Sequence, residues 1–170
     1  MTLILCLSLV ASHLPAMNVG KPFFRNYSAL EYKGHNRNFK ILSDGHGRVF
    51  VANFEGLVVY DGASWSMIHT PGISRITSLY LTAEGILWFG GDDVLGYLNP
   101  DNLNDVTYVA KDTDEGVSFG EITSIFEHNG EIYFVTGDDN AYCVSEGKIE
   151  QRSSDEDFVM ENLMYGWQGP

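Results

Sequence analysis

The chain has 170 residues, of which 44% are hydrophobic and 13% aromatic, and this composition excludes a disordered or collagen-like protein. Its formal net charge is −13, and the whole acidic excess lies in residues 101 to 170. A surface of that sign repels phosphate groups, so we expect no direct nucleic-acid contact from this segment. We interpret the acidic charge as a solvated face that keeps the protein soluble.

The first 16 residues, MTLILCLSLVASHLPA, are an apolar run followed by small residues and a proline. The run is too short to span a bilayer as a helix, which needs about 20 apolar residues, and it is typical of a signal peptide. It lacks a basic start, so the alternatives are a signal peptide truncated at its beginning and a buried strand. We expect the truncated signal peptide, and therefore an exported protein.

Residues 17–37 lead into the first of several repeats and contain the one expected helical turn, near Tyr27 to Tyr32, with Asn26 or Ser28 as its cap. A loop is the alternative. The end of this segment and the first residue after it hold the candidate ligand-binding residues, which combine an aromatic ring with hydrogen-bonding groups suited to sugars. They are Tyr32, His35, Asn36, Arg37 and Asn38. The alternative is that this segment only fastens the N-terminus to the first repeat.

Three similar phrases follow, GRVFVANFEGLVVYDG from Gly47, GILWFGGDDVLGYL from Gly85 and GEIYFVTGDDNAYCVSEG from Gly130. Each copy divides into four short strands separated by turn signals. The predicted strands are 38–42, 48–53, 57–60 and 65–69 in the first copy, 75–81, 87–90, 94–98 and 105–110 in the second, and 121–126, 131–136, 140–144 and 148–152 in the third.

This repetition predicts an all-β fold, a β-propeller of four-stranded antiparallel blades with about three blades present and an incomplete ring. The expected boundaries are 38–74 for blade 1, 75–120 for blade 2, 121–159 for blade 3 and 160–170 for the truncated start of a further blade. Tyr60, Tyr97 and Tyr142 align in the third strands, and we expect them to occupy one packing position against the next blade. Because three blades cannot close a ring, we expect an N-terminal fragment.

Several motifs resemble the N-terminus of the two-component regulator propeller family of Bacteroidetes-type bacteria, over about residues 20 to 150. They are Arg25-Asn26-Tyr27, Gly34-His35-Asn36, the turn from Asp44 to Gly47, Gly56-Leu57, and Tyr60-Asp61-Gly62 with Trp65. The resemblance implies a periplasmic propeller that senses an extracellular ligand, often a polysaccharide fragment. It also implies partners within the parent protein: further blades, a membrane anchor, an output domain that is a histidine kinase or a helix-turn-helix, and a homodimer of the full-length protein.

Two Gly-Asp-Asp turns supply the candidate metal ligands. These are Asp92, Asp93, Asp138 and Asp139. Paired carboxylates suit calcium, but Asp and Gly also build tight turns between strands, and the second interpretation is favoured. The run from Asp112 to Gly116 has the same ambiguity. The two cysteines, Cys6 and Cys143, form no disulfide framework or zinc pattern, so we expect no metal and no cofactor.

Catalytic motifs are missing from the sequence: it contains no phosphate loop, nucleophile elbow, zinc motif or Ser-His-Asp arrangement. Many carboxylates occur, but nothing pairs two of them across a scissile bond, as glycoside hydrolysis requires. We therefore expect no catalytic residue, and a non-enzymatic, ligand-sensing portion of a periplasmic two-component-type regulator with a glycan as its ligand. The alternatives are a polysaccharide-active propeller hydrolase or lyase and a propeller that serves as a protein-interaction module.

Overall fold

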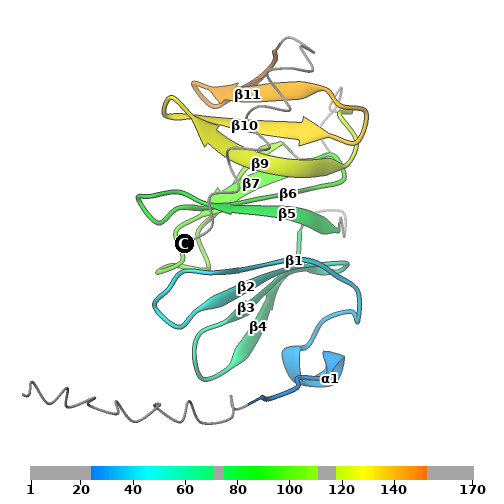
Figure 1. Ribbon diagram of the computed structural model, residues 1–170, viewed down its shortest axis with the longest axis vertical. Helices are drawn as coiled ribbons and strands as arrows, with labels where there is room; N and C mark the ends of the chain where they lie inside the picture. Colours follow the sequence, from blue (N-terminus) through cyan, green and yellow to red (C-terminus); the bar gives the residue numbers. More distant parts are fainter. Residues whose placement is uncertain (1–23, 71–74, 111–117, 153–170) are drawn as a thin grey trace, which may run out of the picture.

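The computed structural model describes residues 24–70, 75–110 and 118–152, which form one short helix and three four-stranded antiparallel sheets stacked in chain order (Figure 1). The helix is α1 (Ala29–Tyr32). Blade 1 contains β1 (Asn38–Ser43), β2 (Val49–Asn53), β3 (Gly56–Tyr60) and β4 (Trp65–Ile68). Blade 2 contains β5 (Ile76–Leu81), β6 (Leu87–Gly91), β7 (Val94–Leu98) and β8 (Val106–Ala110). Blade 3 contains β9 (Ile122–His128), β10 (Glu131–Thr136), β11 (Ala141–Ser145) and β12 (Lys148–Gln151).

The predicted all-β fold and its division into three meanders are confirmed, and the strand ends differ from the predicted ones by at most two residues. Within each sheet the strands pair in sequence order, as consecutive hairpins require. The predicted signal peptide (1–16), the run from Asp112 to Gly116 and the start of a further blade (160–170) lie outside the described residues and stay predictions. Among the described ranges, no helix is both long and apolar enough to cross a membrane.

The helical turn α1 is stabilised at its N-terminus by two reciprocal hydrogen bonds between Ser28 and Glu31. The Glu31 amide donates to the Ser28 hydroxyl at 3.4 Å, and the Ser28 amide donates to the Glu31 carboxylate at 2.8 Å, which is a capping box. The hydrogen bonds from Ser28 lower the pKa of Glu31. Lys33 ends the turn in the left-handed conformation, with φ 58°. The predicted helix is confirmed, with Ser28 as its cap.

The first strand of every blade contains a register shift at the same place. Asn38 and Lys40 pair with consecutive residues of β2, so Phe39 is an extra residue, and Thr77 and Thr123 hold the same position in β5 and β9. The hydroxyl of Thr77 donates to the Ile122 carbonyl of the next blade at 2.6 Å. The repeated bulge means that positions in the three blades can be matched one to one.

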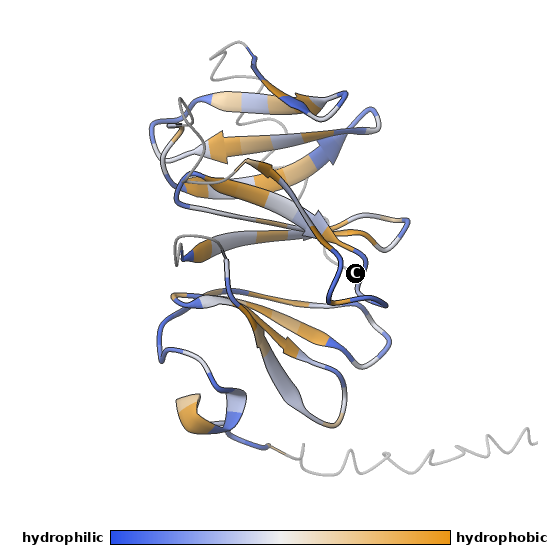
Figure 2. Cartoon of the chain, turned by 180° about the vertical axis from the view of Figure 1, so that it is seen from behind, coloured by the Kyte–Doolittle hydropathy of each residue, from blue (hydrophilic) through white to orange (hydrophobic). Residues whose placement is uncertain are grey.

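The hydrophobic core lies between the blades rather than within one of them. One cluster joins Phe50, Leu57 and Val59 of blade 1 to Leu79 and Phe89 of blade 2, together with further buried neighbours. A second cluster joins blade 2 to blade 3 and includes Trp88, Leu95, Ile125 and Phe134. Figure 2 shows the hydrophobic strands in the interior and the hydrophilic turns at the ends of the blades. Burial of both sheet faces therefore depends on neighbouring blades.

One face of blade 1 is turned away from blade 2, and among the described residues no neighbouring blade covers it. We call it the leading face. The bulge register matches Ile41 with Leu79 and Ile125, and it matches Val51 with Phe89 and Phe134. Leu79 and Ile125 are 1% and 3% exposed, because each packs against the preceding blade. Ile41 is 67% exposed. The described blades thus form an incomplete ring, with the leading face at one end.

The prediction that three tyrosines share one packing position is wrong. Tyr97 and Tyr142 enter the same cluster from opposite sides, since Tyr97 belongs to blade 2 and Tyr142 to blade 3. Tyr60 instead packs against Tyr27 and Trp65. The centroid of its ring lies 5.9 Å from that of Tyr27 and 4.8 Å from that of Trp65. Equal spacing from the repeated glycines does not give equal strand register, because Tyr60 pairs with Val49, Tyr97 with Trp88 and Tyr142 with Phe134, which are not matching positions of the second strands. A shift of one residue along a strand sends its side chain to the other face.

Candidate functional site

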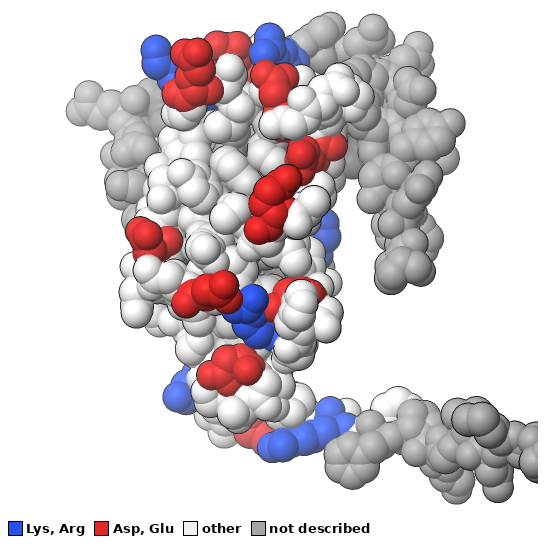
Figure 3. Space-filling model, turned by 90° about the vertical axis from the view of Figure 1, so that its left-hand side faces the viewer, with Lys and Arg blue, Asp and Glu red and all other residues white. Residues whose placement is uncertain are grey.

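One end of the blades collects the turns after β2, β6 and β10 and the segments that lead into β1, β5 and β9, and we call it the connection end. It lies on the right in Figure 1. The opposite end, formed by the hairpins β1–β2, β5–β6 and β9–β10, faces the viewer in Figure 3, where acidic side chains are spread over it with basic ones among them. Loops on a rigid scaffold are where binding residues concentrate, so the connection end is the candidate site.

Asn53, at the end of β2, holds the segment before β1 in place. It is fully buried, and its amide nitrogen donates to the carbonyls of His35 and Arg37 at 2.6 and 3.2 Å. Its amide oxygen accepts from the backbone N–H groups of His35 and Glu55 at 3.1 and 3.0 Å. Because every polar atom of this buried amide is satisfied, the path of residues 35–38 over blade 1 is fixed.

The fixed segment brings three side chains together, which we call the Phe54 cluster: His35, Arg37 and Phe54. The rings of His35 and Phe54 lie 4.8 Å apart, and the Arg37 guanidinium lies 5.9 Å from the centre of the Phe54 ring. Phe54 is 38% exposed. Burial of a phenyl ring would stabilise the fold more than this exposed position does. An exposed aromatic ring beside hydrogen-bond donors provides a flat surface with polar groups at its edge.

A row of contacts leads from the Phe54 cluster across all three blades. The centre of the Phe39 ring lies 5.3 Å from the Arg37 guanidinium and 5.9 Å from the Arg75 guanidinium. Arg75 in turn pairs with Asp92 of blade 2 at 2.9 Å and with Glu121 of blade 3 at 3.0 Å. Arg75 therefore fastens the connection end where blades 2 and 3 meet, and its charge is already balanced by two carboxylates.

The Gly-Asp-Asp carboxylates take part in building turns. Asp93 has φ 48°, and its side chain accepts from the backbone N–H groups of Phe119 and Gly120, both at 2.7 Å. Asp138 accepts from Thr136 and Asn140, and these hydrogen bonds lower its pKa. Asp139 also has positive φ, at 63°. Within the described ranges, no three His, Cys, Asp or Glu side chains gather as a metal site.

We predict that Asp93→Ala destabilises the contact between blades 2 and 3 by about 1–3 kcal/mol, since two backbone N–H groups lose a charged acceptor. Urea unfolding monitored by tryptophan fluorescence measures the loss. Asp93→Asn is the matched control, because it keeps an acceptor oxygen and tolerates the left-handed conformation. Equal losses in the two variants would assign the effect to charge rather than to these hydrogen bonds.

A cavity of about 390 Å³ opens at the connection end of blade 3. It is lined by Ser118, Phe119, Gly120, Glu121, Gly137, Asp138 and Tyr142. Phe119 and Tyr142 form its aromatic side, with ring centroids 6.2 Å apart. Backbone amides, carboxylates and aromatic edges in one hollow suit a polar ligand with an apolar face, such as a sugar.

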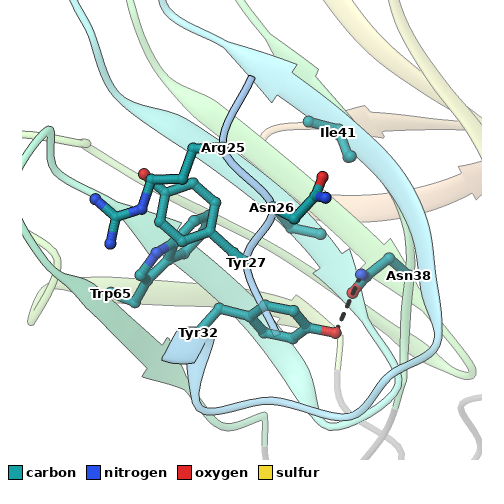
Figure 4. A pocket seen from close by; sticks show the side chains of 8 residues that line it. Arg25, Asn26, Tyr27, Tyr32, Asn38, Ile41 and Trp65 are labelled. Atoms are coloured by element: carbon teal, nitrogen blue, oxygen red, sulfur yellow. Dashed lines mark hydrogen bonds between the residues drawn. The ribbon is translucent and has the colours of Figure 1, made fainter. Parts of the chain in front are cut away.

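A second cavity, of about 430 Å³, lies on the leading face of blade 1 (Figure 4). It is lined by Arg25, Asn26, Tyr27, Tyr32, Asn38, Ile41, Val51 and Trp65. Tyr27 packs edge-on against Trp65 at 5.1 Å, and Arg25 lies over the Tyr27 ring at 4.6 Å. The Asn38 amide donates to the Tyr32 hydroxyl at 3.4 Å.

We assign this second cavity to blade packing rather than to a ligand. Ile41 and Val51 line it, and their counterparts in blades 2 and 3 are buried against the preceding blade. Trp65 contributes a buried indole N–H with no hydrogen-bond acceptor among the described residues. Such a group is satisfied when another polar surface covers it.

The structure divides the predicted binding residues between two places. His35 and Arg37 belong to the Phe54 cluster, with Asn36 exposed between them. Tyr32 and Asn38 line the cavity on the leading face instead. The sequence prediction missed three groups of the connection end: Phe54, Arg75 and Glu121. Phe54 has a recognisable signal, because an aromatic residue directly after a strand and before Glu-Gly must stand in the turn.

The comparisons with known proteins bear on the fold. No family model and no curated protein matches the sequence. Among solved structures, the chain is similar to the WD40 β-propeller domain of Doa1, with a TM-score of 0.52 and 17% identity over 69% of this chain and 40% of that one. It is also similar to selenomethionine-substituted virginiamycin B lyase from Staphylococcus aureus, with a TM-score of 0.52 and 15% identity over 68% of this chain and 41% of that one.

The three sheets are propeller blades. The chain spans about two fifths of the length of these two structures, and identities below 25% extend to the fold alone. A weaker likeness, with a TM-score of 0.46 and 21% identity over 68% of this chain and 17% of that one, is to the extracellular domain of the putative hybrid two-component system BT3049 from B. thetaiotaomicron.

Proposed function

We propose that this chain is a non-enzymatic, ligand-binding part of a propeller sensor, and that it binds an oligosaccharide across its connection end. The observation that carries the proposal is the row from Phe54 through Phe39 and Arg75 to Glu121, which leads from an exposed aromatic ring to the cavity beside Tyr142. Aromatic faces that alternate with hydrogen-bonding groups match the alternating apolar and hydroxyl faces of sugar rings.

The extended shape of this row favours an oligosaccharide over a small metabolite. Its contacts come from all three blades, so a ligand that touches both the Phe54 cluster and the cavity of blade 3 must be a chain of several rings. The groups at both ends are held by buried or paired neighbours, Asn53 at one end and Arg75 at the other. A preorganised surface lowers the entropic cost of binding such a chain.

The absence of enzymatic activity is part of the proposal. A glycosidase acid needs a raised pKa, whereas Asp138 at the cavity has its pKa lowered by hydrogen bonds from Thr136 and Asn140. Glu121 is paired with Arg75 and Asp93 accepts two backbone N–H groups. On the described part of the connection end, these carboxylates already have structural partners.

The cellular role follows from the motif resemblance given above. We propose a periplasmic location, a parent protein of the two-component regulator type with further blades and an output domain, and a signal that passes from the occupied propeller to that output. Ligand contact at the connection end would involve several blades together. Binding would therefore stabilise their relative placement, as expected for a sensor.

A binding and turnover assay on one oligosaccharide panel tests the proposal. Neutral and acidic oligosaccharides of three to six rings are titrated by calorimetry, and the same mixtures are analysed for new reducing ends after a day. We expect binding of at least one oligosaccharide without new ends. Turnover that a single carboxylate substitution abolishes would overturn the non-enzymatic assignment in favour of a hydrolase or lyase, and binding of no saccharide would overturn the function.

A further inference from the structure

Arg37 stands apart from the other arginines of this acidic protein. Within the described residues, Arg48 pairs with Asp101 at 2.6 Å, Arg75 with Glu121 at 3.0 Å, Arg152 with Glu150 at 3.5 Å and Arg25 with Glu31 at 3.9 Å. The guanidinium of Arg37 has no carboxylate partner in that part of the chain, and it lies against the rings of Phe39 and Phe54. In a chain of net charge −13, an arginine without a carboxylate partner among the described residues keeps its capacity for an anion.

His35 adds a second hydrogen-bond donor to the Phe54 cluster. Its Nδ1 accepts the backbone N–H of Arg37 at 3.1 Å, so in the neutral ring the proton resides on Nε2. The His35 ring packs on Phe54 at 4.8 Å. The Phe54 cluster therefore offers donors from Arg37 and His35 and one exposed aromatic face, with no carboxylate among its three members.

We infer that the Phe54 cluster binds an acidic sugar ring, with the anion of that ring on Arg37 and its apolar face on Phe54. The inference rests on the proposed function and specifies its ligand class. A guanidinium binds a carboxylate or sulfate through two parallel hydrogen bonds, and the planar group is already held by its stacking on two rings. A neutral sugar would leave this charge without an anion, so acidic oligosaccharides bind more tightly than neutral ones.

The overall negative charge does not oppose this assignment. The nearest carboxylates along the connection end have structural partners, since Asp92 and Glu121 pair with Arg75 and Asp93 accepts two backbone N–H groups. At physiological ionic strength, charges separated by more than about 8 Å are largely screened. Arg37 supplies the positive charge of the cluster, and its backbone N–H and carbonyl groups are fixed by His35 and Asn53.

The test compares three trisaccharides by calorimetry: trigalacturonate, neutral galactotriose and a sulfated galactotriose. We expect trigalacturonate or the sulfated sugar to bind at least tenfold more tightly than galactotriose, and Arg37→Gln to remove that preference. Arg25→Gln is the matched control, because this exposed arginine lies in the other cavity and its loss leaves the preference intact. Phe54→Ala should weaken the binding of all three sugars.

The affinities for the three trisaccharides distinguish the identity of the anion, the role of Arg37 and the proposed function. A preference for the carboxylated over the sulfated sugar, or the reverse, identifies the anion. Equal binding of neutral and acidic sugars, or an acidic preference that survives in Arg37→Gln, overturns the inference and leaves the proposed function standing. Binding of none of these sugars nor of the wider panel overturns both. Circular dichroism of Arg37→Gln verifies folding, which we expect to be unchanged because the substituted side chain is exposed.

Discussion

Replacing Leu79 by alanine should lower the free energy of unfolding by about 2–5 kcal/mol, the usual range for a large-to-small change in a core. Leu79 is 1% exposed and packs in the cluster between blades 1 and 2. The cavity would open between two blades. Urea unfolding followed by circular dichroism measures the change in midpoint and slope.

Ile41→Ala is the matched control for Leu79→Ala, since the two residues hold the same register position in consecutive blades. Ile41 is 67% exposed, so its truncation should cost less than about 1 kcal/mol, chiefly through the weaker strand preference of alanine. Equal losses in the two variants would mean that the leading face of blade 1 is covered in solution, and the description of an open end would then be wrong.

Replacing Asn53 by alanine should lower the free energy of unfolding by about 2–3 kcal/mol and weaken saccharide binding in the same variant. The substitution leaves the carbonyls of His35 and Arg37 and the amides of His35 and Glu55 without the partner they have in a buried site. The segment that positions the Phe54 cluster would lose its attachment to β2. Thermal unfolding and calorimetric titration measure the two effects.

Asn36→Ala is the control for Asn53→Ala, because Asn36 is an exposed amide in the same segment. We expect a change within about 0.5 kcal/mol, as for ordinary surface positions. If Asn53→Ala lost stability but kept full saccharide affinity, the attachment by Asn53 would be structural only. The ligand would then have to contact groups other than those of the Phe54 cluster.

The blades could be predicted from the sequence because the signal for them is repeated. Strand residues such as Leu87 to Gly91 and Glu131 to Thr136 alternate with glycine-rich turns, and the same arrangement returns three times. The direction of individual side chains could not be predicted in the same way. Tyr97 and Tyr142 point into one interface from opposite blades, because turns of different length shift the alternation by single residues.

The site was only partly predictable, and the reason is physical. His35 and Arg37 are polar residues in a connecting segment, so composition alone marked them as candidates. Their neighbour Phe54 is brought to them by a hydrogen bond from its backbone N–H to the Arg37 carbonyl at 3.1 Å, a contact across the first hairpin. The pairing of Arg75 with Glu121 joins residues of two blades. Contacts of this kind depend on how blades stack, which a single strand pattern does not encode.

The bulge shared by β1, β5 and β9 bears on how such an array is assembled. Phe39, Thr77 and Thr123 occupy the extra position with an aromatic ring in one case and a hydroxyl in two. What the three copies have in common there is a backbone path and not a side chain. A designer who wished to graft another unit onto this protein would have to reproduce that one-residue insertion first, and could then choose the residue that fills it to suit the neighbour.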